Sequence, residues 1–148
     1  MRAVIQRVID ANVEVDGTIV GKIGRGLVVY VGVQVNDTID DAMKLAYKIS
    51  NARVFYDENG KMNLSVQDIK GSILSISQFT LYGDTSKGHR PSYDKAARPE
   101  LANRLYESFN TKMRTVVPVE TGTFQMHMTI RQTNDGPVTV IYETKEAK

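Results

Sequence analysis

The residues with the clearest chemical potential are a threonine, its neighbours and two histidines. Thr80 follows Gln78 and Phe79 at the polar end of an otherwise apolar segment. A threonine hydroxyl acts as a nucleophile when a base activates it, and the adjacent sequence offers no such base. Threonine is also a good strand former. The local sequence therefore leaves both interpretations of Thr80 open.

The two histidines give no metal signature. His89 and His127 lie far apart in the chain, neither has a second histidine at ligand spacing, and the chain has no cysteine. His127 alternates with apolar residues, which favours the polar face of a strand. His89 lies in a loop rich in glycine and lysine, where we expect solvent or a phosphate contact. We therefore expect neither a metal site nor a cofactor.

Two glycine motifs resemble nucleotide-binding loops but fail in detail. Gly17 and Gly21 precede Lys22 with a spacing one residue too short for a phosphate-binding loop, and no serine or threonine follows the lysine. Gly24 and Gly26 lack the third glycine of a dinucleotide fingerprint. We interpret both motifs as turns. No Gly-x-Ser-x-Gly motif is present either.

The composition is that of an ordinary globular chain. It has 148 residues, 41% hydrophobic and 24% charged, with 19 Lys+Arg against 17 Asp+Glu and a net charge of +2. This length predicts one domain, residues 1–148. The charge is too small for a dedicated nucleic-acid binder, so any RNA contact must be local. Without cysteines, a signal-peptide pattern or a membrane-spanning segment, we expect a cytoplasmic protein with no membrane partner.

Apolar alternation predicts a strand-rich chain with two helices. Residues 2–8, 13–15 and 19–23 alternate, with a hairpin turn at Asp16 and Gly17. Further strands are expected at residues 26–31, 54–56, 71–82, 124–131 and 138–143, with turns at 57–60 and 134–137. Residues 145–148 should form a frayed tail.

Helical signals complete the prediction. Thr38 and Asp41 have capping-box spacing before an apolar stripe that ends near Ile49, and Pro99 suits the first position of a second helix. The predicted fold is a single α+β domain. It combines a strand-rich antiparallel or mixed, barrel-like sheet with about two packed helices.

Five segments, taken together, resemble the D-aminoacyl-tRNA deacylase family. They are residues 1–8 (MRAVIQRV), 60–63 (GKMN), 77–82 (SQFTLY), 87–99 (KGHRPSYDKAARP) and 134–139 (NDGPVT). Their order and spacing match the family across nearly the whole chain. The resemblance implies a metal-free hydrolase that cleaves the ester of D-aminoacyl-tRNA, and also of glycine mischarged on tRNA-Ala. It further implies a homodimer with active sites at the subunit interface.

The resemblance also assigns site residues. Gln78, Phe79 and Thr80 would be catalytic and line the pocket for the terminal adenosine and the ester. For substrate binding it implies Ser77, Met128, Arg7, Gly136 and Pro137. Gly136-Pro137 would carry a cis peptide bond and reach into the partner's pocket, and Arg7 would hold that loop of the other subunit.

This arrangement suggests how handedness is selected. Carbonyl oxygens flanking the cis bond would accept hydrogen bonds from the substrate's α-amino group. An L side chain would then clash with the rigid backbone, whereas a D side chain would point toward open space and glycine would pass. For catalysis, we favour backbone N–H groups of Phe79 and Thr80 as oxyanion donors, with the 2′-hydroxyl of the tRNA activating water, over Thr80 as the nucleophile.

Two features refine the expectation. Lys87, Arg90, Lys95 and Arg98 form either a solvated face or a patch for acceptor-stem phosphates. Where the family commonly has Gly-Ala, this chain has Gln125 and Met126, which we expect to narrow the pocket or change strand packing. Two other functions are compatible with the chain but less favoured: a non-catalytic RNA-binding or chromatin-associated scaffold, against which the intact 77–82 and 134–139 segments argue, and another esterase, which the absence of a catalytic triad disfavours.

Overall fold

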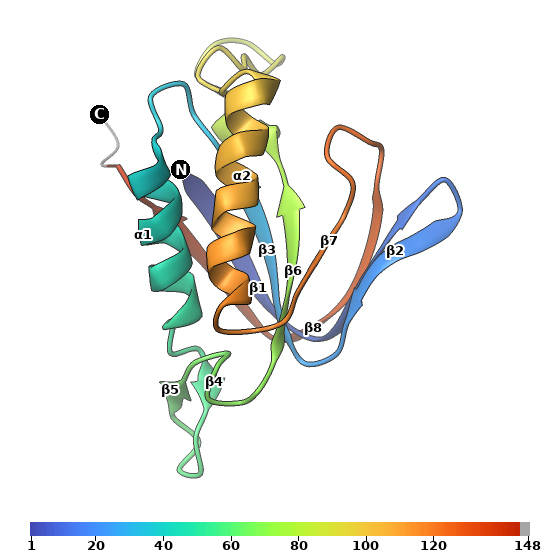
Figure 1. Cartoon of the computed structure of the whole chain (residues 1–148), viewed down its shortest axis with the longest axis vertical. Helices are drawn as coiled ribbons and strands as arrows, with labels where there is room; N and C mark the ends of the chain where they lie inside the picture. The colour runs from blue at the N-terminus through green and yellow to red at the C-terminus, as the bar shows by residue number, and fades with distance from the viewer. Residues whose placement is uncertain (146–148) are drawn as a thin grey trace.

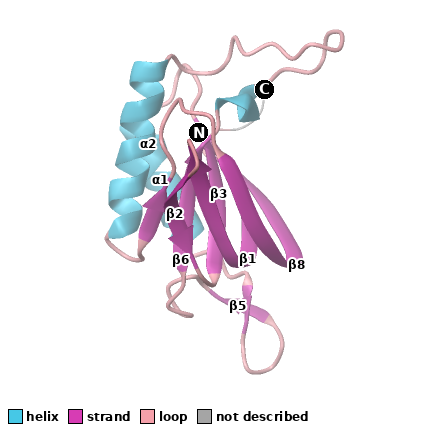
Figure 2. Cartoon of the chain, turned by 90° about the vertical axis from the view of Figure 1, so that its right-hand side faces the viewer, coloured by secondary structure: helices cyan, strands magenta, loops and turns pink. Residues whose placement is uncertain are grey.

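The computed structural model describes residues 1–145 and has two helices on one face of a mixed sheet (Figures 1 and 2). The sheet contains β1 (Arg2–Val15), β2 (Thr18–Ile23), β3 (Gly26–Gly32), β6 (Ser72–Ser77), β7 (Val119–Thr121) and β8 (Thr129–Glu143). The other elements are α1 (Ile39–Ser50), the two-stranded sheet of β4 (Phe55–Tyr56) and β5 (Met62–Leu64), the 3₁₀ turn η1 (Phe79–Tyr82) and α2 (Pro99–Arg114). The α+β prediction is confirmed.

The long strand β1 organises the sheet. Its first half pairs with β3 and its second half with β2, while β8 runs antiparallel along nearly its whole length. The sequence predicted two separate strands here, but residues 2–15 form one. The predicted hairpin turn is confirmed, because Asp16 and Gly17 have φ of 49° and 80°, the positive values that tight two-residue hairpins need.

The sheet curls until it is nearly closed. β3, β6 and β7 are parallel neighbours, and β2 approaches β7 from the other end of the strand order. A Cβ built on Gly21 of β2 would lie 2.7 Å from the carbonyl oxygen of Thr121, so only glycine permits this approach. Val13, Val28 and Leu74 fill the interior that the curled sheet encloses.

Both helices form where the sequence predicted them. Thr38 and Asp41 make the capping box of α1, and Pro99 occupies the first turn of α2. Their apolar stripes pack between the helices and the sheet, where Leu45 and Phe109 are fully buried. The larger core of the molecule lies in this layer.

The strand predicted at residues 71–82 is wrong after Ser77. β3, which pairs with β6 as far as Ser77, itself ends at Gly32, and β7 pairs only with residues 73–75. Without a neighbour to complete its backbone hydrogen bonds, the chain leaves the sheet and forms η1.

Two predictions near the C-terminus are also wrong. Residues 124–128 form a loop instead of the start of a strand, because Thr129 already pairs with Glu14 near the end of β1. Residues 134–137 do not reverse the chain. Asn134, before the segment, pairs with Val8, and Thr139, after it, pairs with Gln6, so the strand keeps its direction along β1. The residues between them form a bulge inside β8, where the register shifts.

The chain ends meet at a buried group of charges. The Met1 ammonium lies 2.8 Å from the Asp37 carboxylate, and the Lys145 ammonium contacts both Asp37 and Asp41. Lys145 is therefore held in place, so the prediction of a frayed tail is wrong for this residue. Residues 146–148 of the predicted tail lie outside the described residues. Within residues 1–145, no helix is long and apolar enough to cross a membrane.

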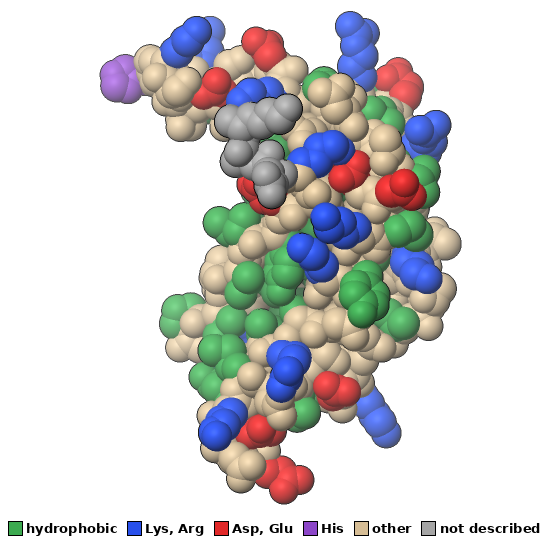
Figure 3. Space-filling model, turned by 90° about the vertical axis from the view of Figure 1, so that its left-hand side faces the viewer, with side chains coloured by type: hydrophobic (Ala, Val, Ile, Leu, Met, Phe, Trp, Pro, Cys, Tyr) green, Lys and Arg blue, Asp and Glu red, His purple; other side chains and the backbone are tan. Residues whose placement is uncertain are grey.

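Apolar side chains remain exposed on the sheet. Ile9 of β1 is 55% exposed and Ile141 of β8 is 65% exposed. Figure 3 shows hydrophobic side chains gathered along one hollowed flank, below a projecting segment that carries lysine and arginine side chains. A patch of this kind is typical of an interaction surface.

Candidate active site

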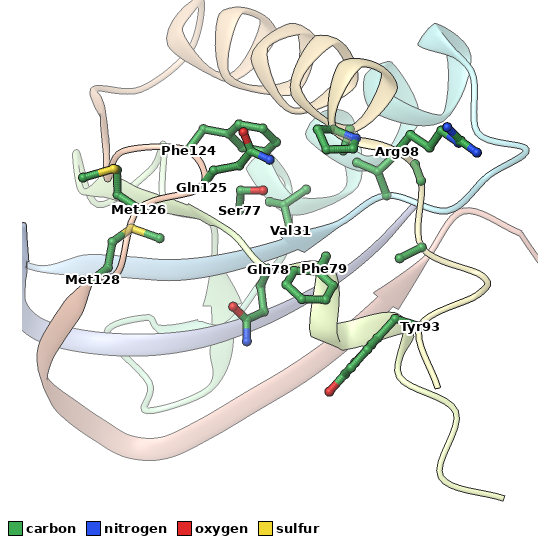
Figure 4. Close-up of a pocket in the computed structure, with 15 residues that line it drawn as sticks. Val31, Ser77, Gln78, Phe79, Tyr93, Arg98, Phe124, Gln125, Met126 and Met128 are labelled. Atoms are coloured by element: carbon green, nitrogen blue, oxygen red, sulfur yellow. The ribbon is translucent and has the colours of Figure 1, made fainter. Parts of the chain in front are cut away.

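A cavity of about 610 Å³ opens between the end of the sheet, the turn η1 and the first residues of α2. Most of its lining is apolar. The lining residues are Val31, Val33, Ser77, Gln78, Phe79, Tyr93, Ala96, Ala97, Arg98, Pro99, Ala102, Phe124, Gln125, Met126 and Met128. Figure 4 shows Met126 and Met128 at one end of this group, and Tyr93 and Arg98 at the other.

The turn η1 presents backbone donors beside this cavity. The Gln78 N–H donates to the Val31 carbonyl at 2.8 Å, which fixes the entry to the turn. The first hydrogen bond of the turn runs from the Leu81 N–H to the Gln78 carbonyl, at 3.3 Å. The N–H groups of Phe79 and Thr80 precede it and have no partner within the turn. Two adjacent backbone donors are thus available to a bound molecule.

Thr80 itself is exposed and does not line the cavity. Its hydroxyl accepts a hydrogen bond from the Gln78 side-chain amide, which is not a base. The interpretation of Thr80 as an activated nucleophile therefore gains no support from its contacts.

Aromatic side chains form the walls. Phe79 and Tyr93 meet edge to face with their ring centroids 5.1 Å apart. On the other wall, Phe124 stacks on Tyr106 at 6.4 Å, and the Tyr106 hydroxyl donates to the Ser75 carbonyl at 2.7 Å. Burial raises the pKa of Tyr106, so the phenol keeps the proton that it donates.

Gln125 and Met126 lie in a tight turn at the cavity. The Met126 N–H donates to the Thr123 carbonyl at 3.2 Å, and Gln125, the third residue of this turn, has φ of 65°. Turns with a positive φ at this position usually carry glycine. Both side chains line the cavity, and the narrowing expected of them stays a prediction. The positive φ of Gln125 is part of the loop that replaces the predicted strand.

Gly136, Pro137 and Arg7 form a second group, away from the cavity of their own chain. The Gly136-Pro137 peptide bond is cis, and both residues are exposed. Arg7 of β1 pairs with Leu27 of β3. Leu27 lies four residues before Val31, which lines the cavity, so Arg7 is well separated from the cavity along the sheet. The eight predicted site residues therefore fall into two places in one chain.

Arg7 is almost fully buried, with 2% exposure, and holds the Gly136-Pro137 loop of its own chain. Its Nε donates to the Asp135 carbonyl at 3.2 Å, and its Nη1 donates to the Val54 carbonyl at 2.7 Å. Its guanidinium also lies 4.6 Å from the centroid of the Tyr56 ring. These contacts are made within one chain, and the expectation that Arg7 holds the loop of the other subunit stays a prediction.

Few titratable groups reach the cavity. Among its lining residues in the described chain, only Tyr93 and Arg98 can ionise. His89 and His127 are exposed and do not line it, and residues 1–145 contain no cluster of three or more carboxylate or histidine side chains suited to a metal ion. The cavity therefore offers backbone donors and shape instead of a side-chain acid and base.

The sequence prediction missed several lining residues. Tyr93 and Phe124 were given no role, although they build opposite walls. Tyr93 lies in the 87–99 segment that resembles the family, in a basic loop between the cations Arg90 and Lys95. An aromatic residue at this position could have indicated a substrate-binding side chain. The four cations of that loop, Lys87, Arg90, Lys95 and Arg98, are all exposed.

A family model and a curated relative match nearly the whole chain and name the same activity. The family model described as D-Tyr-tRNA(Tyr) deacylase matches residues 4–143. A D-aminoacyl-tRNA deacylase of Desulforamulus reducens is 54% identical over 147 residues, 99% of each chain. A solved structure titled c-Myc DNA Unwinding Element Binding Protein is 39% identical with a TM-score of 0.94, covering 99% of this chain and 100% of that one. Another, of a probable eukaryotic D-amino acid tRNA deacylase, has a TM-score of 0.82 at 18% identity, with coverage of 95% and 97%.

Proposed function

The chain belongs to the D-Tyr-tRNA(Tyr) deacylase family, and on that premise we propose that it hydrolyses the ester bond between a D-amino acid and its tRNA. The products are the free D-amino acid and the tRNA, and the substrate implies action in the cytoplasm. The observation that carries this proposal is the pair of unpartnered N–H groups at Phe79 and Thr80 beside a cavity whose lining contains no carboxylate, histidine or lysine side chain.

The proposed chemistry uses backbone donors and the substrate itself. Water attacks the ester carbonyl, and the N–H groups of Phe79 and Thr80 stabilise the oxyanion of the tetrahedral intermediate. The ribose 2′-hydroxyl next to the ester accepts a proton from this water and passes its own proton to the 3′-oxygen. The bond to the 3′-oxygen then breaks, which leaves the free amino acid and a tRNA with its 3′-hydroxyl restored. Losing one oxyanion donor typically raises the barrier by about 3 kcal/mol.

Substrate binding would use the cavity and the basic loop. Ser77, Gln78 and Met128 line the cavity, which we assign to the terminal adenosine and the ester. Arg98 lies at one end of the cavity (Figure 4), and the same loop carries the exposed cations Lys87, Arg90 and Lys95. Phosphate contacts carry no sequence information, which suits an enzyme that must accept many tRNAs.

Handedness would be selected by a second copy of the chain. The exposed Gly136-Pro137 loop lies away from its own cavity and is fixed by the buried Arg7, so it is rigid enough to act as a wedge in the partner's cavity. Its carbonyl oxygens would accept hydrogen bonds from the substrate's α-amino group and direct an L side chain into the backbone. Glycine has no side chain to clash, so glycine mischarged on tRNA-Ala should also be hydrolysed.

A homodimer is proposed on the same ground. The cavity and the loop that should complete it lie in different places of one chain. The exposed apolar side chains of Ile9 and Ile141 offer a surface for a second copy.

The reaction is tested with matched D- and L-tyrosyl-tRNA in the presence of a chelator, by following free amino acid. We expect rapid release from the D substrate and none above the spontaneous rate from the L substrate. Equal release from both, or none from either, would contradict the proposal.

A second candidate is a nucleic-acid-binding role without catalysis, which the 39% identity to the solved structure titled c-Myc DNA Unwinding Element Binding Protein favours. Competition binding of deacylated tRNA and duplex DNA tests it. If duplex DNA binds at least as tightly as tRNA while no ester is cleaved, this second role is the better account.

A further inference from the structure

The turn that carries the proposed oxyanion donors is too short to be stable alone. η1 spans four residues, and the backbone hydrogen bonds at its two ends, from Leu81 to Gln78 and from Gly83 to Thr80, both have the weaker 3₁₀ geometry. Such a turn keeps its shape only when the surrounding structure holds it. The position of the Phe79 and Thr80 N–H groups therefore depends on contacts from outside the turn.

The entry to the turn is fixed by the sheet. The Gln78 N–H bonds to Val31, as described above, and a Cβ on Gly32 would lie 3.1 Å from the Cβ of Leu81. The turn thus packs closely over the end of β3. On this side Leu81 and Tyr82 are held by close packing against Gly32, and the Leu81 carbonyl is bound from another side.

Arg2 supplies that second anchor. Its Nη1 donates to the Leu81 carbonyl at 2.7 Å, and its guanidinium carbon lies 4.7 Å from the centroid of the Tyr82 ring. Its Nε donates to the Glu143 carboxylate at 2.5 Å, a cross-strand pair between β1 and β8. Figure 2 shows the short turn beside the N-terminus.

We propose that Arg2, oriented by Glu143, is a positioning residue that sets the geometry of the oxyanion donors at Phe79 and Thr80. This inference rests on the proposed function. The guanidinium suits the task because its rigid fork donates to a carboxylate and a carbonyl at the same time while its face lies on an aromatic ring.

The chain contains a matched pair for comparison. Glu14 and Arg131 join the same two strands near their other ends, with 3.4 Å between Nη1 and Oε1. Neither contacts η1 in any described interaction of residues 1–145. The Arg2 and Glu143 side chains are 30% and 32% exposed, so their ion pair contributes little to stability as such. If Arg2 acted only as a cross-strand ion pair, the two pairs would be equivalent.

The experiment compares Arg2→Ala, Arg2→Lys, Glu143→Gln and the control Arg131→Ala, using D-tyrosyl-tRNA and thermal unfolding. We expect Arg2→Ala to lower kcat by about tenfold to a hundredfold, since a misplacement near 1 Å costs this much. KM should change less than about twofold, because the interaction is made in the transition state. Arg2→Lys should recover part of kcat, and Glu143→Gln should lower kcat less than Arg2→Ala.

Three outcomes would overturn the assignment while leaving the proposed function intact, and the first two concern kcat. One is an unchanged kcat in Arg2→Ala, and the other is an equal loss in Arg2→Ala and Arg131→Ala. A fall in melting temperature of Arg2→Ala that accounts for the lost activity, without recovery in Arg2→Lys, would also assign Arg2 to the fold alone. If the unaltered protein does not release D-tyrosine, the proposed function itself fails.

Discussion

Arg7 joins three parts of the chain through one buried guanidinium. Its bonds reach the carbonyls of Val54 and Asp135, and its face lies against Tyr56. A buried acceptor that loses its donor costs about 1–3 kcal/mol. Arg7 therefore links the stability of the chain to the position of the Gly136-Pro137 loop.

We predict that Arg7→Ala lowers the free energy of unfolding by about 2 kcal/mol. It should also lower the preference for D- over L-tyrosyl-tRNA by about tenfold, because the loop loses its anchor. Denaturant unfolding and paired deacylation rates measure the two effects. Arg53→Ala, at an exposed arginine bonded to Asn63, should change neither. Unaltered D-over-L preference in Arg7→Ala would refute the anchoring role.

Thr80 separates two mechanisms. If backbone N–H groups stabilise the oxyanion, Thr80→Ala keeps them and should retain kcat within about tenfold. Loss of a true nucleophile costs on the order of a millionfold. Single-turnover deacylation distinguishes these results. Complete loss of activity, with the fold and tRNA binding intact, would show that the hydroxyl takes part in the chemistry.

At the scale of the element, the start of α1 is stabilised by a charge. Burial alone would raise the pKa of the Asp41 carboxyl. Hydrogen bonds from Lys145, Thr144 and the Thr38 backbone outweigh this effect and hold the pKa well below its usual range. A carboxyl with a lowered folded-state pKa contributes stability above its unfolded pKa, about 4, and this contribution is lost as the pH falls further.

Asp41→Asn should therefore lower the free energy of unfolding by about 2 kcal/mol at pH 7. Below about pH 4 the difference from the unaltered chain should shrink, since the unfolded chain then binds a proton at Asp41 that the folded chain does not, which favours unfolding. Urea unfolding between pH 7 and pH 2.5 checks this expectation. Asp40→Asn, an exposed residue in the same turn, is the control. A pH-independent difference for Asp41→Asn would contradict the assignment.

Elements governed by local chemistry could be predicted from the sequence. The cap of α1 depends on residues three apart, and the hairpin at Asp16 depends on two adjacent residues, so both were found. The end of β6 depends on where β3 stops, and the loop at Gln125 depends on how far β1 extends. These limits are set by neighbouring strands distant in sequence.

The candidate site likewise contains residues that the sequence indicated and residues that only contacts between distant segments bring into it. The resemblance indicated Ser77, Gln78, Phe79 and Met128, and they line one cavity. Phe124 becomes a wall only through its stacking on Tyr106 of α2. Arg2 reaches η1 only because β1 lies beside the turn, and its position among alternating strand residues gave no sign of this contact.

For the whole molecule, binding of tRNA should depend on salt. Phosphate contacts release counterions, and the cations expected to make them are Lys87, Arg90, Lys95 and Arg98. A plot of the logarithm of the binding constant against the logarithm of the salt concentration should therefore fall with a slope of a few units. The double variant Lys87→Gln, Arg90→Gln should lower this slope by about one to two. Lys112→Gln, an exposed lysine near the end of α2, should leave it unchanged. Equal slopes in all three proteins would exclude the basic loop from tRNA binding.

The central claim is that two chains build one site, with the cavity from one and the Gly136-Pro137 loop from the other. Mixed dimers test this claim most directly. Ala102→Phe fills the cavity, and Gly136→Ala disturbs the loop, because φ at Gly136 is 131° and a Cβ there would lie 3.3 Å from Nη2 of Arg7. Each variant alone should lose D-selective deacylation. After co-refolding, the mixture should regain about a quarter of the unaltered activity, since random pairing makes half of the molecules heterodimers with one intact site each. A mixture as inactive as its two components, with heterodimers present, would contradict the shared site.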